Sequence, residues 1–455
     1  MSPLAERQAV LTELGRYWNP NAATALAAAS RPIEEVAKGT TVIADDGSEW
    51  LDFAGSYGVF FIGHGNERVR EAVRSGLKAS ALLPGLAHPA LAELEETLLE
   101  SLPPELNRFV LGSSGAETTE TALRIAGLAR PDRDRVLVCE DSYHGKTLSA
   151  LSVLGQTNHR VPFTPFEVDP VTVPYGDADA VRRALAGGDV AAVFLEPVLG
   201  GAHLTVPPRG YVAEVARACR DTDTLLVVDE IQTGLGRTGK MFGFEHDGVV
   251  PDIVLLSKAL TGGFVAVSVC ASRADVLMEA EKHPDFRPGL LGPGSTVSAP
   301  AVSAAAATLR EVRSQELPAR AARLGPRLTE GLAAAVRRHP KHLIDAPGIG
   351  LMAGLRVRNP SVELLVSMGM AQRGIHTGHS LNESIDHPVL RFYPPATVSE
   401  KEIDRVLTAL EETLVWLDRR PRVLTDAITW LLRKRYDLPP QLALTLSHSK
   451  HRVDW

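Results

Sequence analysis

Three segments that could do chemistry each follow a short apolar run in the sequence. The segment 112–117 (GSSGAE) follows the run at 108–111, Asp229 follows the run at 224–228, and Lys258 follows the run at 252–256. Ligands of open α/β sheets bind at the carboxyl ends of the strands. If the runs are strands of one sheet, the three segments are therefore the first places to look for a site.

The segment 112–117 has the features of a helix start that binds an anion. Ser114 and Glu117 have the spacing of a capping box. Small residues leave backbone N–H groups open at a helix N-terminus, and such a terminus binds phosphate or carboxylate groups. On its own, the segment is more typical of an ordinary helix cap without a ligand.

Asp229 and Lys258 are charged residues at positions where a buried strand is expected to end. A buried carboxylate is costly unless it is paired, and lysine is almost never fully buried without a reason. Taken singly, Asp229 could cap a loop and Lys258 could reach the surface. Together with an anion site they match the needs of pyridoxal 5′-phosphate (PLP), namely a phosphate cradle, an acid beside the ring nitrogen and an amine that forms a Schiff base.

The surrounding pattern predicts an α/β domain that would position these residues. Apolar runs of strand length occur at 108–111, 135–139, 191–195, 224–228, 252–256 and 264–270. Several are apolar at consecutive positions, as in a parallel sheet that is buried on both faces. Helical patterns at 117–129, 177–185 and 212–220 alternate with these runs.

The flanking regions have a different pattern. Residues 40–51 predict a hairpin around an Asp-Asp-Gly turn, and an Ala-rich stretch from Val302 to about Arg338 predicts one long helix. Residues 343–419 mix strand-like runs with helices, which indicates a smaller α+β domain. The final residues, 421–455, contain a helix candidate at 425–436 and read as an extension.

Composition narrows the classes of function. The chain has 48 basic and 55 acidic residues, a net charge of −7, so we do not expect a nucleic-acid partner. Its three cysteines are far apart and form no CxxC, which argues against a disulfide framework or a metal site. The sequence begins without a secretory pattern and has no apolar run of membrane-spanning length, so we expect no membrane partner and a cytoplasmic location.

Several longer motifs resemble the class III (ornithine/putrescine-type) aminotransferases of the fold type I PLP enzymes. They are DFAGSYG at 52–58, SGAE at 114–117, YHGKT at 143–147, EPV at 196–198, LVVDEIQTGLGRTG at 226–239, PDIVLLSKAL at 251–260 and LRFYPP at 390–395. The resemblance covers residues 30–420. It implies a large, mostly parallel α/β domain with a smaller C-terminal α+β domain, and PLP as the cofactor.

The resemblance also assigns roles to individual residues. Lys258 matches the Schiff-base lysine and Asp229 the acid that pairs with the pyridine nitrogen, and these two are the expected catalytic residues. Residues that match cofactor contacts are Ser114, Gly115, Ala116, Tyr143, Gln232, Ser295 and Thr296. Residues that match the substrate side are Tyr57, Lys146 and Arg391.

The family's architecture implies a homodimer with shared active sites, in which Ser295 and Thr296 reach the phosphate of the neighbouring subunit's cofactor. The implied division places an N-terminal segment at 1–85, which packs with the small domain and the dimer partner. The large PLP domain is expected at 86–335, the small domain at 336–420 and the extension at 421–455.

The substrate side departs from the family pattern. Leu199 and Gly201 stand where relatives carry a glutamine and a glutamate, and in many relatives that glutamate masks the arginine that matches Arg391. We therefore expect Arg391 to be unmasked and to favour the carboxylate of an α-amino acid. The alternative is that Arg391 pairs with another acid, such as Glu383 or Asp386.

These observations favour a PLP-dependent aminotransferase that acts on an α-amino acid or an amine. A second hypothesis is an elimination, replacement or carbon–carbon bond-forming enzyme of specialised metabolism. Its substrate would carry a γ leaving group, as S-adenosylmethionine does. A third is a non-catalytic PLP-binding regulator or scaffold, against which the retention of Asp229 and Lys258 argues.

Overall fold

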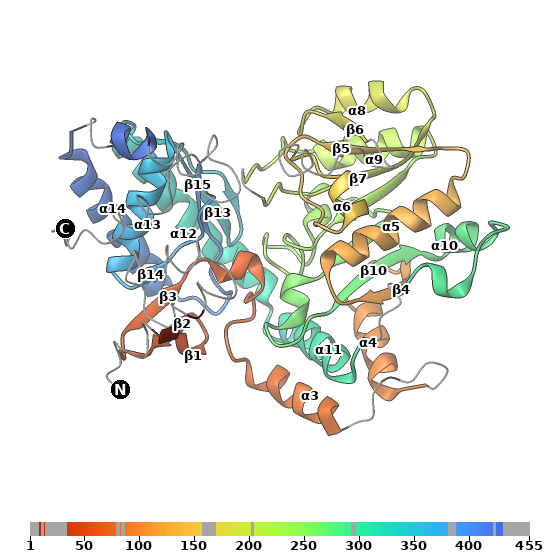
Figure 1. The fold of residues 1–455 in the computed structure, drawn as a ribbon, viewed down its shortest axis with the longest axis horizontal. Helices are drawn as coiled ribbons and strands as arrows, with labels where there is room; N and C mark the ends of the chain where they lie inside the picture. The colour runs from red at the N-terminus through yellow and green to blue at the C-terminus, as the bar shows by residue number, and fades with distance from the viewer. Residues whose placement is uncertain are drawn as a thin grey trace.

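The structure is a computed structural model that describes residues 9–10, 13, 34–78, 82, 87–156, 170–201, 204–292, 297–380, 388–421 and 425–430. Figure 1 shows two lobes, with the N-terminal strands beside the C-terminal elements in one lobe and the middle of the chain in the other. Within these residues no helix is both long and apolar enough to cross a bilayer.

The larger lobe is built on a seven-stranded sheet. Its strands, in spatial order, are β4 (Leu106–Gly112), β10 (Ser268–Arg273), β9 (Ile253–Leu256), β8 (Leu225–Asp229), β7 (Val190–Leu195), β5 (Arg135–Cys139) and β6 (Val171–Val173). Neighbouring strands from β9 to β6 are parallel, whereas β10 is antiparallel to both β4 and β9. The expected mostly parallel α/β fold is confirmed.

Both faces of this sheet are buried, as the continuous apolar runs predict. Every residue of β7, β8 and β9 is buried, and alternate residues contribute to two hydrophobic cores on opposite faces. The helices that cover the sheet are α5 (Gly115–Ala129), α6 (Leu148–Ser152), α8 (Ala178–Leu185), α9 (Tyr211–Asp221) and α10 (Ala274–Glu281). The parallel order brings the ends of β8 and β9 to the same edge of the sheet.

The predicted strand at 264–270 is displaced in the structure. The chain first forms the short helix η4 (Lys258–Thr261) and then passes through Gly262 and Gly263, whose φ angles are +58° and +81°. Only from Ser268 does it pair with β9 and β4. The two glycines permit a left-handed turn that the apolar pattern does not reveal.

The smaller lobe contains two further sheets. β1 (Glu34–Lys38), β2 (Thr41–Ala44), β3 (Glu49–Asp52) and β14 (Ile375–His376) form one, in which β2 and β3 make the expected hairpin. The other contains β11 (Leu343–Asp345), β12 (Gly348–Ile349), β13 (Met352–Val357) and β15 (Val389–Phe392). They lie with α13 (Pro360–Gln372) and α14 (Glu400–Asp418) (Figure 1). Residues 425–430 are helical.

The expected single helix over 302–338 is wrong. The structure has two helices, α11 (Ala299–Ser314) and α12 (Leu317–Arg338), and Glu316 between them has a φ of +49°. Pro318 stands in the first turn of α12, where proline favours a helix start. α11 packs on α3 (Glu67–Lys78) and α4 (Pro89–Leu99) of the larger lobe. α12 contacts α14 and the β11–β13 strands of the smaller lobe.

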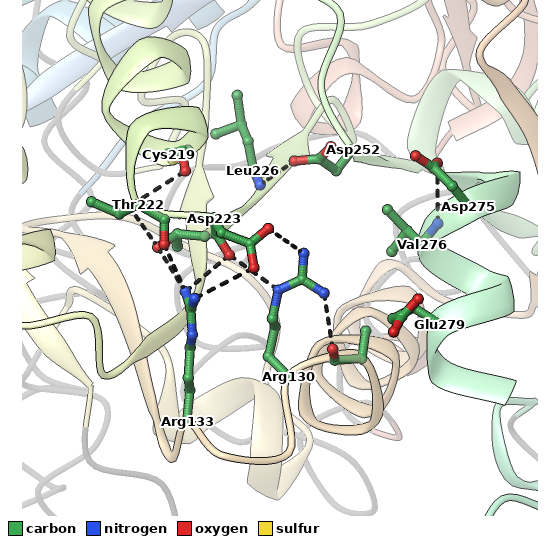
Figure 2. Close-up of polar contacts among 12 residues, drawn as sticks. Arg130, Arg133, Cys219, Thr222, Asp223, Leu226, Asp252, Asp275, Val276 and Glu279 are labelled. Atoms are coloured by element: carbon green, nitrogen blue, oxygen red, sulfur yellow. Dashed lines mark hydrogen bonds and ion pairs between the residues drawn. The ribbon is translucent and has the colours of Figure 1, made fainter. Parts of the chain in front are cut away.

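An arginine cluster ties the turns together at the amino ends of the parallel strands (Figure 2). Arg133 donates to the carbonyls of Thr222 and Asp223 at 3.0 and 2.9 Å, and Arg130 forms an ion pair with the Asp223 carboxylate at 2.8 Å. At the start of β9, Asp252 accepts a hydrogen bond from the backbone of Leu226 at 2.8 Å. These contacts hold the sheet at the end opposite Asp229 and Lys258.

Candidate active site

A cavity of about 380 Å³ lies where β8, β9 and α5 meet the smaller lobe. The residues from the sequence analysis that line it are Tyr57, Gly115, Ala116, Tyr143, Lys146, Asp229, Gln232, Lys258 and Arg391. Ser114 is the N-cap of α5, directly before this lining. Ser295 and Thr296 lie outside the described residues.

The N-terminus of α5 forms one wall of the cavity. The Ser114 side chain accepts from the backbone N–H of Glu117 at 3.3 Å, but the Glu117 carboxylate accepts from Ser113 at 2.6 Å and not from Ser114. The expected capping box is therefore only half formed. Because the first N–H groups of a helix have no partner within it, those of Gly115 and Ala116 are available to an anion.

Glycine at position 115 allows this helix to approach the sheet closely. A Cβ atom at Gly115 would lie 2.6 Å from Ile231 Cδ1, and a Cβ at Gly145, whose φ is +121°, would lie 2.6 Å from the Ala116 Cβ. Side chains at these positions would push α5 and the 143–147 segment apart. The cradle for an anion thus depends on both glycines.

Asp229 ends β8 and is buried, with 4% of its surface exposed. One carboxylate oxygen, Oδ1, accepts from the backbone N–H of Ile231 at 3.0 Å, and the other, Oδ2, lies 2.8 Å from His144 Nδ1. Sequence reasoning missed His144, although it stands within the YHGKT motif. The hydrogen bond fixes the direction in which the carboxylate points.

A second buried acid lies beside this pair. Glu196 accepts from the backbone N–H of Tyr143 at 2.8 Å and from that of Gly200 at 3.1 Å. Burial raises the pKa of Glu196 to about 7, against the lowering effect of His144 and with a further increase from Asp229. Glu196 was also missed as a site residue, and it holds both the Tyr143 segment and the Gly200 turn in place.

The histidine between the two acids favours its charged form. Burial favours the neutral ring, but the hydrogen bond to Asp229 and the charges of Asp229 and Glu196 outweigh it and raise the pKa of His144. A raised pKa in the folded state means that the protonated ring contributes stability below its ordinary pKa. This contribution disappears as the pH rises through the raised pKa.

We therefore expect His144→Asn to destabilise the apoprotein more at pH 6 than at pH 9. The loss in the free energy of unfolding should be larger at pH 6 than at pH 9 by about 1.4 kcal/mol for each unit by which the pKa of His144 is raised. Denaturant unfolding of both proteins at the two pH values measures it. Turnover of the holoenzyme should fall about ten- to a hundredfold, as is common when a residue that orients a functional side chain is replaced. A stability loss that is equal at both pH values would contradict the charged state.

Lys258 has an unusual backbone conformation. It follows Ser257 at the end of β9 and begins η4 with a φ of +41°, in the left-handed region that lysine rarely adopts. The Ser257 hydroxyl donates to the carbonyl of Val267 at 3.1 Å, which ties this turn to the segment that precedes β10. Strained residues of this kind gather at functional sites, and this one lines the cavity.

Tyr57, which also lines the cavity, lies in a second left-handed turn. Ser56 and Tyr57 have φ angles of 47° and 59°. The Asp52 carboxylate accepts from the backbone N–H groups of residues 54 and 55 at 2.9 Å each, and its other oxygen lies 2.8 Å from His64 Nε2. Gln232 Nε2 donates to the Tyr57 carbonyl at 2.9 Å, so the turn is held from both sides.

Arg391 lies on β15 and is almost fully buried, with 1% of its surface exposed. Its guanidinium donates to the carbonyl of Gly201 at 2.9 Å and to the carbonyl of His379, and it stacks on the Tyr57 ring with its Cζ 4.8 Å from the centroid. The expectation of an unpaired arginine is therefore wrong. Gly201 has no side chain, but its backbone carbonyl is one of the acceptors of the guanidinium.

The remaining residues lie at the edge of the cavity. Lys146 is exposed, and its Nζ lies 5.7 Å from the centroid of the Tyr143 ring. Glu383 and Asp386, the alternative partners for Arg391, lie outside the described residues.

The residues of this cavity fit PLP. The N-terminus of α5 supplies backbone N–H donors for a phosphate. Asp229 supplies a carboxylate for a protonated ring nitrogen. Lys258 supplies an amine and Tyr143 an aromatic face. The two glycines that leave room for this cradle support the same fit, because side chains there would close it.

Comparison with known proteins agrees with the fit. The family model "Aminotransferase class-III" matches residues 26–414. The chain is 34% identical over 382 residues to the putrescine aminotransferase of Pectobacterium atrosepticum, which covers 82% of this chain and 80% of that protein. It is also 35% identical over 326 residues to the aminotransferase PigE of a Serratia species. That match covers 70% of this chain but only 38% of PigE.

Solved structures give the same picture. The ornithine aminotransferase of Toxoplasma gondii has a TM-score of 0.78 and 29% identity, over 85% of this chain and 91% of that one. An amine transaminase from an uncultivated Pseudomonas species, solved with PLP bound, has a TM-score of 0.76 and 26% identity. This match covers 85% of this chain and 95% of that one.

Proposed function

This chain belongs to the class III aminotransferases, and from that premise we propose that its amino donor is an α-amino acid whose carboxylate binds to Arg391. The chain is a PLP-dependent aminotransferase with the fold of the fold type I enzymes. The observation that carries the substrate proposal is that Arg391 lines the cavity and donates there to the backbone carbonyls of Gly201 and His379. A carboxylate is a stronger partner for a guanidinium than a neutral carbonyl, so a substrate carboxylate can replace such a carbonyl as the acceptor.

In this proposal Lys258 and Asp229 are the catalytic residues of the reaction on the cofactor. When bound, PLP supplies an aldehyde that takes up the amino group and a ring that accepts electrons from the substrate. Lys258 holds the cofactor through its amine and accepts the proton from the substrate carbon that bears the amino group. Asp229, oriented by His144, keeps a negative charge beside the ring nitrogen.

The binding residues follow the matched motifs in this proposal. Ser114, Gly115 and Ala116 hold the phosphate at the start of α5, Tyr143 stacks on the ring, and Gln232 lies beside the ring oxygen. Tyr57 and Lys146 border the substrate together with Arg391. These assignments are supported by position. The assigned residues that the structure describes line one cavity, except Ser114, which directly precedes the lining residue Gly115.

We also propose a homodimer in which Ser295 and Thr296 of one subunit contact the cofactor phosphate of the neighbouring subunit. The proposed domains are an N-terminal segment at 1–85, the large PLP domain at 86–335, the small domain at 336–420 and an extension at 421–455. Two exposed apolar side chains support the homodimer: Tyr57, which lines the cavity, is 46% exposed, and Leu148, the first residue of α6, is 68% exposed. A cytoplasmic location and a role in specialised metabolism complete the proposal, the latter supported by the altered residues Leu199 and Gly201.

The elimination and carbon–carbon bond-forming hypothesis is not favoured by the comparisons, because the relatives are aminotransferases. The same relatives leave a purely non-catalytic scaffold without support. Transamination is tested directly by incubating the holoenzyme with candidate amino acids and measuring keto-acid formation against leaving-group release.

We expect Arg391→Ala to lower kcat/KM for α-amino acids about ten- to a hundredfold. A charge-assisted bidentate hydrogen bond contributes about 1.5–3 kcal/mol, and the variant loses both the charge and the fork. A diamine without a carboxylate, such as putrescine, should be affected little. Steady-state kinetics with both substrate classes measure the difference.

Arg391→Lys is the matched control for this prediction. Lysine keeps the charge but not the planar fork, so its effect on α-amino acids should lie between those of the unmodified enzyme and Arg391→Ala. The substrate proposal fails if Arg391→Ala leaves α-amino acid kinetics unchanged. It also fails if the unmodified enzyme prefers putrescine-like diamines.

A further inference from the structure

Two glutamine side chains lie against the consecutive glycines 200 and 201 in the wall of the cavity. A Cβ atom at Gly200 would lie 1.5 Å from Gln232 Oε1, and a Cβ atom at Gly201 would lie 2.6 Å from Gln156 Nε2. The amides therefore occupy the space in which side chains at these two positions would begin. The Gln156 amide thus stands beside the residue whose carbonyl binds Arg391.

Gln156 is held in this place and is nearly buried. It has 6% of its surface exposed, it lines the cavity, and its Nε2 donates to the carbonyl of Asp141 at 3.2 Å. Since an amide nitrogen carries two N–H donors, one donor remains beyond this bond. No other hydrogen bond of the Gln156 side chain occurs in the part of the chain that the structure describes.

The two acids of the cavity have hydrogen-bond partners within the protein, and several donor side chains line the same cavity. Asp229 is engaged by His144 and a backbone N–H, and Glu196 by two backbone N–H groups. Arg391, Lys146, Lys258 and the two glutamines line the same cavity. This balance of charges and donors suits a ligand that carries a negative charge.

We propose that Gln156 determines substrate specificity by donating its second amide N–H to the carboxylate that Arg391 binds. This inference rests on the proposed function and extends it from one residue to two. Gly201 is part of the arrangement because only a residue without a side chain leaves room for the amide. The ligand class is a carboxylate-bearing amine or keto acid, recognised by one guanidinium and one neutral amide.

The proposal is tested with three variants that change the amide in different ways. Gln156→Met keeps the length of the side chain but removes the donor, and Gln156→Glu places a negative charge beside the carboxylate. Gly201→Ala leaves Gln156 intact, but its methyl group must displace the amide. Gln372, an exposed residue at the end of α13, provides the matched control Gln372→Met.

The measured quantity is the ratio of kcat/KM for an α-amino acid to kcat/KM for putrescine. We expect this ratio to fall about tenfold in Gln156→Met and Gly201→Ala, and about a hundredfold in Gln156→Glu. Gln372→Met should leave it unchanged. Calorimetric binding of succinate, an unreactive dicarboxylate, to each holoenzyme should weaken in the same order, and the cofactor's absorbance reports whether a variant is folded and loaded.

The outcomes separate this inference from the proposed function. If Arg391→Ala lowers the ratio but all three new variants keep it, the role of Gln156 is refuted and the substrate proposal stands. If Arg391→Ala also leaves the ratio unchanged, the carboxylate site itself is wrong. A ratio that falls in Gln156→Met but not in Gly201→Ala likewise overturns the proposed arrangement, because displacing the amide must have the effect of removing its donor.

Discussion

Replacing Lys258 with alanine should abolish multiple turnover, with a loss of about 10⁴-fold or more. The amine is expected both to hold the cofactor and to move the proton of the substrate, and alanine can do neither. Borohydride reduction followed by peptide mapping should place PLP on Lys258 in the unmodified enzyme and leave the variant unlabelled. The variant should also lose the absorbance of covalently attached cofactor.

Lys240→Ala is the matched control, because Lys240 is an exposed lysine of the same lobe whose Nζ donates to the carbonyl of Glu245 at 3.1 Å. It should retain both labelling and turnover. Labelling of a different lysine in the unmodified enzyme would move the catalytic role away from Lys258. The left-handed conformation of Lys258 would then need another explanation.

The large sheet could be predicted from the sequence because its central strands are buried on both faces. Consecutive apolar residues in β7, β8 and β9 leave few alternatives, and a charged residue at or just after the end of two of them marks the ligand edge. The predicted element boundaries are wrong where the backbone conformation of single residues determines the start or end of a helix or strand. Glu316 breaks one expected helix into two, and Gly262 and Gly263 delay the start of β10.

The candidate site could be predicted from the sequence to the extent that its residues are chemically distinctive. Lys258 and Asp229 stand out as charges at strand ends, whereas His144, Glu196 and Gln156 lie against residues that are distant in sequence. His144 is 85 residues from Asp229. Only the fold shows that the ring and the carboxylate meet.

The misjudged state of Arg391 has a different cause. The sequence shows that no acid stands at position 201, which predicts an unpaired guanidinium. A residue without a side chain still has a carbonyl, and in the structure that carbonyl accepts the hydrogen bond. Whether a buried donor is satisfied is a question about the backbone as well as the side chains.

Replacing Asp229 with alanine should weaken PLP binding and slow removal of the substrate's α-proton by about 10²–10⁴-fold. The carboxylate is expected to keep the ring nitrogen of the cofactor protonated, and without it the ring accepts electrons poorly. Exchange of the α-hydrogen of the substrate into deuterated water measures this step directly. The pH titration of the cofactor's absorbance gives a second readout that does not depend on turnover.

Asp252→Asn is the matched control for the Asp229 prediction. Asp229 is buried at the end of β8, whereas Asp252 is half-buried and directly precedes β9 at the opposite end of the sheet. Asp252 accepts from the backbone N–H of Leu226 (Figure 2). Its loss should affect stability and leave the cofactor's titration unchanged. If Asp229→Ala exchanges the α-hydrogen at a near-normal rate, the carboxylate only positions His144. The negative charge beside the ring must then be assigned to another group.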